Sequence, residues 1–138
     1  MARPDHVFGD TSFFFACLEP LDASHQRALD LARQVAHGRW IVHTTWDVVS
    51  ETTTLLRYRS SFAAARTFLS EVKPTLRIAE YGRRVRAEAE EIFLQYGRER
   101  RFSLCDAISF VVITTLLDRT PCLTFDDDFR ALGLTVVS

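Results

Sequence analysis

Two short apolar runs at opposite ends of the chain are each followed by aspartate, and this pairing constrains the fold more than any other feature. The first run, residues 7–9, leads into Asp10, and the second, residues 121–123, leads through Thr124 into residues 126–128, which are all aspartates. Adjacent carboxylates are costly to fold around, because like charges a few ångströms apart repel and raise one another's pKa unless a cation lies among them. We therefore expect a metal ion here, in one acidic site shared by both strands.

Short β-rich runs alternate with helical patterns over the whole chain. The patterns predict strands at 7–9, 40–44, 76–79, 122–125 and 134–137. They predict helices at 12–18, 25–38, 45–59, 61–73, 81–97 and 104–117. The fourth helix, capped by Ser60 or Ser61, is expected to carry an apolar face of Phe62, Ala65, Phe68 and Leu69. Strands separated by helices imply right-handed crossovers, so we expect one three-layer α/β/α domain over residues 1–138 with a central, mainly parallel sheet.

The composition is that of an ordinary globular protein. Hydrophobic residues make up 47% and charged residues 25%, and the net charge of −1 gives no whole-molecule attraction to nucleic acid. Cys17, Cys105 and Cys122 have no paired spacing, so we expect buried thiols rather than a disulfide frame or a zinc site. No run approaches the roughly 20 apolar residues of a membrane span, and residues 1–5 lack the apolar stretch of a signal peptide. A cytoplasmic location is the resulting expectation.

Four acids stand at positions that suggest one site. Asp10 and Asp126 each follow an apolar strand run, and in open α/β sheets the ligand crevice lies beyond the carboxyl ends of the strands. Glu51 lies in a helical segment between Val49 and a run of threonines, and Asp106 opens a helix that is otherwise almost wholly apolar. The conjunction of the four acids favours a shared function.

Each acid also has a structural explanation when it is taken alone. Asp106 can complement the dipole of its helix, and Glu51 can be an exposed helical residue. Asp10 can be a helix N-cap, and Asp126 can begin a turn. All four structural explanations would have to hold at once for the four acids not to form a shared site.

Clustered carboxylates with no adjacent cysteine or histidine favour Mg²⁺ or Mn²⁺ over zinc. Such ions can activate a water molecule against phosphorus, and paired ions roughly 3.5–4 Å apart also stabilise the leaving oxygen. Phosphodiester hydrolysis suits this chemistry, because a carboxylate cage without cations would repel an anionic substrate.

At this point the chain resembles the PIN-domain nucleases, and among them the VapC-type toxins of type II toxin–antitoxin pairs. The resemblance rests on Asp10-Thr11-Ser12 after the first strand, on Glu51 about 40 residues later, and on residues 102–110 and 123–129, whose sequences are FSLCDAISF and LTFDDDF. It covers nearly the whole chain, and its C-terminal half is the more specific part.

The resemblance implies a Mg²⁺- or Mn²⁺-dependent endoribonuclease acting on RNA such as tRNA or rRNA. Its catalytic and metal-binding acids would be Asp10, Glu51, Asp106 and Asp126. Asp128 would be an auxiliary for a second metal or for water, while Asp127 would face solvent. Hydrogen bonds near the metal or substrate would come from Thr11 or Ser12 and from Thr124.

The resemblance also implies partners. Similar toxins pair with a small antitoxin and tend to form homodimers, so a homodimer or a toxin–antitoxin hetero-oligomer is expected. Arginines in the linker before the last long helix are expected to contact RNA or the antitoxin: Arg98, Arg100 and Arg101. Arginines at 83–86 are more simply explained by ion pairs with nearby glutamates of the same helix.

Other functions of an acidic α/β site fit the residues less well. A haloacid-dehalogenase-type phosphatase would need a second aspartate two residues after Asp10, where Ser12 stands. A phosphoacceptor receiver domain would need a lysine near the site, whereas Lys73, the only lysine, precedes Pro74 at a helix end. The remaining alternative is a non-catalytic or DNA-directed PIN-like domain that acts mainly through protein–protein contacts.

Overall fold

A single five-stranded sheet forms the centre of the computed structural model, which describes residues 5–138. The first four residues, part of the segment that lacks a signal-peptide pattern, lie outside the described residues. The strand order is β3-β2-β1-β4-β5, with β1 at His6–Gly9, β2 at Ile41–Thr44, β3 at Arg77–Ile78, β4 at Cys122–Leu123 and β5 at Val136–Val137. Every pairing is parallel, and the last three strands are shorter than their predicted ranges.

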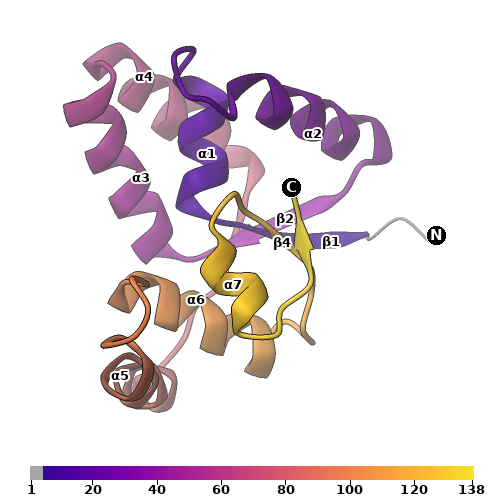
Figure 1. Ribbon diagram of the computed structural model, residues 1–138. Helices are drawn as coiled ribbons and strands as arrows, with labels where there is room; N and C mark the ends of the chain where they lie inside the picture. Colours follow the sequence, from indigo (N-terminus) through magenta and orange to yellow (C-terminus); the bar gives the residue numbers. More distant parts are fainter. Residues whose placement is uncertain (1–4) are drawn as a thin grey trace.

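Helices cover both faces of this sheet, as the alternating pattern predicts. In residues 5–138 they are α1 (Thr11–Leu18), α2 (His25–Gly38), α3 (Trp46–Arg59), α4 (Phe62–Thr67), α5 (Arg83–Tyr96), α6 (Leu104–Thr115) and α7 (Asp127–Ala131). Figure 1 shows α1 and α2 above the sheet and α5 and α6 below it. The expected α/β/α architecture is confirmed. Among these helices, none combines the length and apolar character needed to cross a membrane.

Hydroxyl caps fix where several helices begin. Thr45, Ser61 and Ser103 each precede a helix, and each side chain accepts a hydrogen bond from a backbone N–H of the first turn. A cap of this kind satisfies one of the helix's unpaired donors and stabilises the helix by about 1 kcal/mol. The caps therefore set the start of α3 and α6, which carry two of the predicted acids.

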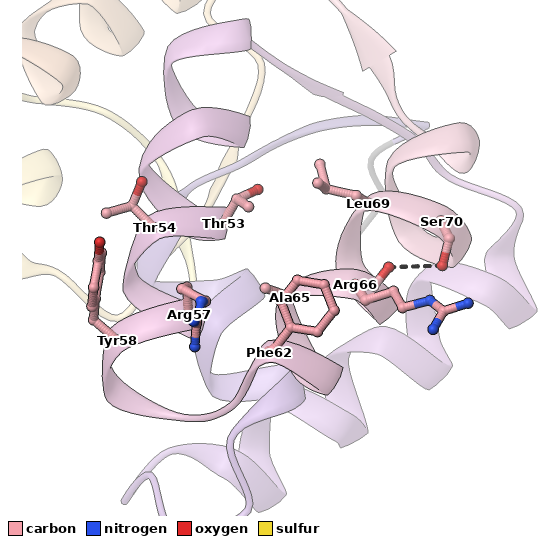
Figure 2. Close-up of a pocket in the computed structure, with 9 residues that line it drawn as sticks. All are labelled: Thr53, Thr54, Arg57, Tyr58, Phe62, Ala65, Arg66, Leu69 and Ser70. Carbon is pink, nitrogen blue, oxygen red and sulfur yellow. Dashed lines mark hydrogen bonds between the residues drawn. The ribbon is translucent and has the colours of Figure 1, made fainter.

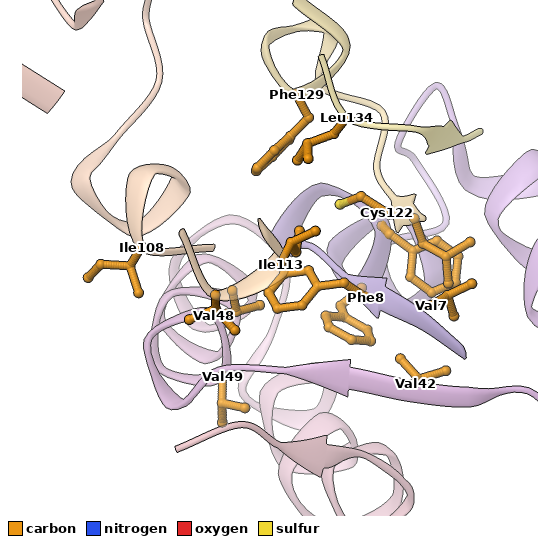
Figure 3. Close-up of a cluster of buried hydrophobic side chains, with 14 of the residues drawn as sticks. Val7, Phe8, Val42, Val48, Val49, Ile108, Ile113, Cys122, Phe129 and Leu134 are labelled. Atoms are coloured by element: carbon orange, nitrogen blue, oxygen red, sulfur yellow. The ribbon is translucent and has the colours of Figure 1, made fainter. Parts of the chain in front are cut away.

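The hydrophobic core lies where the sheet meets its helices (Figure 3). The central strand β1 contributes Val7 and Phe8, which are fully buried, and Val42 of β2 lies beside them. Further core side chains come from α3, α6 and the C-terminal segment: Val48, Val49, Ile108, Ile113, Cys122, Phe129 and Leu134. Cys122 is a free, buried thiol, whereas Cys17 and Cys105 are only half-buried.

Gly9 ends the central strand because no larger residue fits there. A Cβ atom at this position would lie 2.3 Å from Cζ of Phe14, whose ring packs over the strand end from α1. Phe14 in turn packs against Phe68, with the ring centroids 5.4 Å apart. The glycine therefore lets α1 pack closely on β1, immediately beside Asp10.

The apolar face predicted for the fourth helix is only half correct. Ala65 and Phe68 are buried, but Phe62 is 62% exposed and Leu69 is 40% exposed. Phe62 and Leu69 are seven residues apart and so lie on one side of the helical segment, whereas Ala65 and Phe68 lie on the side that meets the core; a π-helical turn, Phe68–Val72, follows α4. Phe62 and Leu69 instead line an open groove between α3 and α4 (Figure 2).

Candidate active site

The predicted acids meet at the carboxyl end of the sheet, where the chain changes direction across β1. From β1 the chain builds outward through β2 and β3, and it later returns to place β4 on the other side of β1. Topological switch points of this kind form crevices beyond the strand ends. A cavity of about 480 Å³ lies here and is lined by Asp10, Glu51, Asp106 and Asp126.

Asp10 is held by a network of hydroxyl groups. Its Oδ2 accepts hydrogen bonds from Thr124 Oγ1 at 2.8 Å and from Ser12 Oγ at 3.1 Å. The two hydroxyls also lie 3.0 Å from each other, so the segment after β1 is tied to the segment after β4. Backbone bonds add to this connection, since the N–H of Asp10 donates to the carbonyl of Leu123.

One oxygen of Asp10 has no partner. The residue is only 3% exposed, and its buried Oδ1 makes no hydrogen bond with any described residue. Burial raises the pKa of Asp10 from 3.8 to about 6, although the hydrogen bonds from Thr124 and Ser12 oppose the shift. A buried, unpaired carboxylate oxygen is costly, so this atom is the clearest indication that the site binds a cation.

The triple aspartate divides into three different environments. Asp126 lines the cavity, and its Oδ1 accepts from the N–H of Asp128 at 2.9 Å, which caps α7. Its own N–H donates to Thr124 Oγ1 at 3.0 Å. Asp127 has a 97% exposed side chain and lies 3.7 Å from Arg130. Asp128 is half-buried outside the cavity lining, and desolvation followed by the charge of Asp126 raises its pKa.

Asp106 has a structural role and also faces the other acids. Its Oδ2 accepts from the N–H of Ser103 at 2.9 Å while Ser103 Oγ accepts from its N–H at 3.0 Å, which is a capping box at the start of α6. Desolvation and then the charge of Asp10 raise the pKa of Asp106 to about 7. Asp126 and Glu51 raise it further, so these carboxylates act on one another electrostatically.

Glu51 is half-buried on the cavity side of α3, rather than on an exposed helical face. The thiol of Cys105 lies within hydrogen-bonding reach of it, and burial followed by the charge of Glu51 raises the pKa of that thiol. The sequence pattern gives Cys105 no place in the acidic site. Its position directly before Asp106 on the first turn of α6 is the signal that could have indicated it.

The remaining predicted site residues lie at different depths. Thr11 is buried in the cavity wall, and its hydroxyl has no hydrogen-bond partner among residues 5–138. The linker arginines are exposed and do not line the cavity: Arg98, Arg100 and Arg101. Arg100 is nevertheless close enough to Asp128 to lower the pKa of that carboxyl. The linker therefore borders the acidic site on the α7 side.

The four predicted carboxylates line one cavity, and two of them, Asp10 and Asp106, have a raised pKa. The family model of the PIN domain matches residues 7–134. The chain belongs to the PIN-domain family. The match covers the four segments that carry the predicted acids, and it confirms the family resemblance that rests on these segments. Within residues 5–138, however, no three acidic, histidine or cysteine side chains form a preassembled metal cage.

Solved structures with the same fold include toxins of this family. VapC20 of Mycobacterium tuberculosis, a sarcin–ricin loop cleaving toxin, is 28% identical over 94% of this chain and 96% of its own, with a TM-score of 0.79. VapBC2 from Rickettsia felis, bound to a DNA fragment from its promoter, is 11% identical with a TM-score of 0.66, covering 96% and 97% of the two chains. FitAcB from Neisseria gonorrhoeae is 14% identical with a TM-score of 0.67, covering 96% of each chain. The last two similarities show the fold alone. No curated protein sequence matches the chain significantly.

Several cavity residues have no motif that would have identified them. The lining includes side chains from α1, the loop before α2 and the second half of α3: Phe15, Asp22, Ser24, Leu55 and Arg59. Leu55 and Arg59 follow Glu51 at intervals of four residues, which places all three on one helical face. That spacing is the sequence signal that could have identified Leu55 and Arg59.

Proposed function

We propose that the protein is a Mg²⁺- or Mn²⁺-dependent endoribonuclease and the toxin of a VapBC-type toxin–antitoxin pair. The observation that carries the proposal is the unpaired Oδ1 of Asp10, which is buried beside Asp106 and Asp126 in one cavity. Burial and mutual repulsion make Asp10 and Asp106 costly to ionise without a cation. A divalent ion would remove that cost and could activate water for phosphodiester hydrolysis.

The donor set fits a hard cation. Asp10, Glu51, Asp106 and Asp126 offer carboxylate oxygens, and Mg²⁺ is commonly bound by one or two protein carboxylates together with water and phosphate. When bound, such an ion neutralises charge on the phosphodiester and activates water as the nucleophile. Asp128 is proposed as an auxiliary group at the rim.

The protein's own hydroxyls orient the acids. Thr124 and Ser12 both donate to Oδ2 of Asp10, which leaves Oδ1 as the oxygen that would hold a cation. The N–H of Ser103 engages Oδ2 of Asp106 in the same way. Each carboxylate is therefore fixed through one oxygen, and its other oxygen would be the one to hold a metal, since hydrogen bonds of this kind orient groups that bind metal. The buried Thr11 hydroxyl is proposed to bond to substrate or water.

An RNA target is proposed because VapC20, the most similar of the three structures in sequence, is a sarcin–ricin loop cleaving toxin. We extend this to structured RNA such as tRNA or rRNA. The exposed arginines of the linker would attract the backbone: Arg98, Arg100 and Arg101. Access to such RNA requires a cytoplasmic protein.

An antitoxin partner is proposed for the groove between α3 and α4. Tyr58 is 82% exposed and Phe62 is 62% exposed there, and the guanidinium of Arg57 lies 5.7 Å from the centre of the Phe62 ring. Exposed aromatic and arginine side chains are typical of protein interfaces. VapBC2, which has a similar fold, was solved bound to a DNA fragment from its promoter, and we propose that this chain forms a hetero-oligomer with its antitoxin or a toxin homodimer.

Cleavage assays test the proposed activity. Purified protein is incubated with structured RNA in Mg²⁺ or Mn²⁺, and cleavage is expected to stop with EDTA. Asp10→Ala and Asp126→Ala should each abolish cleavage, whereas the exposed Asp127→Asn should retain it. Full activity in either alanine variant would overturn the assignment of the site. Cleavage of DNA but not RNA would favour the DNA-directed alternative, and no cleavage of either would favour the non-catalytic one.

A further inference from the structure

One face of α3 continues the acidic cavity away from the proposed metal ligands. Glu51, Leu55 and Arg59 are spaced by four residues, and all three line the cavity. Side chains at this spacing lie above one another on a helix, and eight residues at 1.5 Å per residue separate the first from the last by about 12 Å. The cavity therefore extends two helical turns beyond Glu51 and ends at the positively charged guanidinium of Arg59.

Arg59 is the basic residue of this cavity. The other charged side chains in its described lining are acids: Asp10, Asp22, Glu51, Asp106 and Asp126. Ion pairs within residues 5–138 join Arg33 to Asp30 and Arg130 to Asp127, and none involves Arg59. Its guanidinium is exposed at the C-terminal end of α3 and has no carboxylate within 4 Å in the described chain. A guanidinium in this state is available to an anionic ligand.

Apolar side chains line the cavity between Arg59 and the proposed metal ligand Glu51, and around them. Leu55 lies between Glu51 and Arg59 on α3, and Phe15 of α1 and Phe125 after β4 line the same cavity. All three are half-buried, so each presents part of its surface to the cavity. Phe125 is also 6.5 Å from Phe13, centre to centre, which ties it to α1. An apolar patch with aromatic rings, placed between a metal site and an arginine, matches the alternation of base and phosphate in a nucleotide.

We propose that this extension is a nucleotide subsite, in which Arg59 binds a phosphate flanking the scissile one and Phe15 stacks on an unpaired base. The inference rests on the proposed nuclease function and specifies its substrate further. A base can enter the cavity only when it is unstacked, so the subsite selects single-stranded or looped RNA. The cavity volume of about 480 Å³ lies in the usual range for sites that bind small ligands.

The experiment measures binding separately from cleavage. A fluorescein-labelled single-stranded oligoadenylate of about 10 nucleotides is titrated with the Asp10→Asn protein in Mg²⁺, and fluorescence anisotropy is followed at several NaCl concentrations. Arg59→Gln, Arg59→Lys and Phe15→Leu are added to this background. Arg57→Gln is the matched control, because Arg57 lies on the same helix but lines the groove between α3 and α4.

Each variant has a distinct expected result. Arg59→Gln should weaken binding about five- to tenfold and lower the slope of log affinity against log salt by about 0.7, the contribution of one phosphate contact on a single strand. Arg59→Lys should retain the slope. Phe15→Leu keeps apolar volume but removes the aromatic face, so it should weaken binding about fivefold and leave the slope unchanged. Arg57→Gln should match the parent.

Two results would overturn the inference, and they differ in what they imply for the proposed function. If wild-type protein cleaves RNA while Arg59→Gln and Arg57→Gln bind alike with the parent slope, the subsite is refuted and the nuclease stands. If the Asp10→Asn protein does not bind RNA and the wild type does not cleave it, both proposals fail. Circular dichroism of each variant establishes that the fold is retained.

Discussion

Replacing Asp10 by asparagine removes one charge from the most deeply buried acid of the cavity. In the metal-free protein, burial raises the pKa of Asp10 from 3.8 to about 6. At 1.36 kcal/mol per pKa unit, ionising this group destabilises the folded state by about 3 kcal/mol relative to the unfolded state at pH above 6. For a chain of this length that corresponds to a melting-temperature difference on the order of 10 °C.

The pH dependence follows from the sign of the shift. Because the folded pKa lies above the unfolded one, the folded state binds the proton more tightly. The stability that protonated Asp10 contributes is therefore fully present below about pH 4 and is lost as the pH rises through the folded pKa of about 6. Asp106, whose pKa is raised to about 7, extends this loss to higher pH. Metal-free protein should thus become less stable between about pH 4 and pH 7, and Asp10→Asn should reduce that loss.

The asparagine has its own cost, which does not depend on pH. Its carbonyl can still accept from Thr124 and Ser12, but its amide group takes the position of the unpaired Oδ1 and costs about 1–3 kcal/mol. The difference between two pH values cancels this cost. The change in stability from about pH 4 to pH 8 should therefore be about 2–3 kcal/mol smaller in Asp10→Asn than in the wild type.

Thermal and urea unfolding in EDTA, repeated with Mg²⁺ or Mn²⁺, provide the assay. Wild-type protein should gain stability from the ion, increasingly so at higher pH, because an ion that binds only the folded state stabilises it by mass action. Asp10→Asn should lose most of that gain, while the exposed Asp127→Asn should behave as the wild type. Equal pH dependence in Asp10→Asn and wild type, with an unchanged response to the ion, would refute this account of the buried carboxylate.

Two further substitutions test the packing around the site. Thr124→Val should destabilise the protein by about 2 kcal/mol in urea unfolding, because it removes the hydroxyl that bonds to Asp10 and to the N–H of Asp126. Thr124→Ser keeps a hydroxyl and should recover most of this stability. Wild-type stability in Thr124→Val would contradict the hydrogen-bond network. Gly9→Ala should cost about 1–3 kcal/mol, since its Cβ would lie 2.3 Å from the Phe14 ring. When Phe14→Leu is combined with Gly9→Ala, the total loss of stability should be smaller than the sum of the losses in the two single variants. Additive losses would show that the Phe14 ring is not the cause.

Periodicity and capping residues determine most of the fold without tertiary information. Apolar runs that end in Asp10 and Asp126, with helical patterns between them, are enough to predict a mainly parallel sheet with acids at its carboxyl edge. Local signals are reliable here because each cap and each alternating run depends on neighbours a few residues away. Ser61 and Ser103, for example, both cap the helices that follow them.

Only the tertiary structure decides what each side chain meets. The sequence cannot show that Thr124 bonds to Asp10 across 114 positions, or that Oδ1 of Asp10 is left unpaired. It likewise predicts a continuous apolar face that includes Phe62 and Leu69, and both of these side chains are exposed in the folded protein. In the sequence Arg59 is an ordinary residue at a helix end. In the folded protein it lines a cavity together with residues of α1 and of the segment after β4. Long-range packing sets burial and hydrogen-bond partners, and these determine the pKa of each acid and the surfaces left free for ligands.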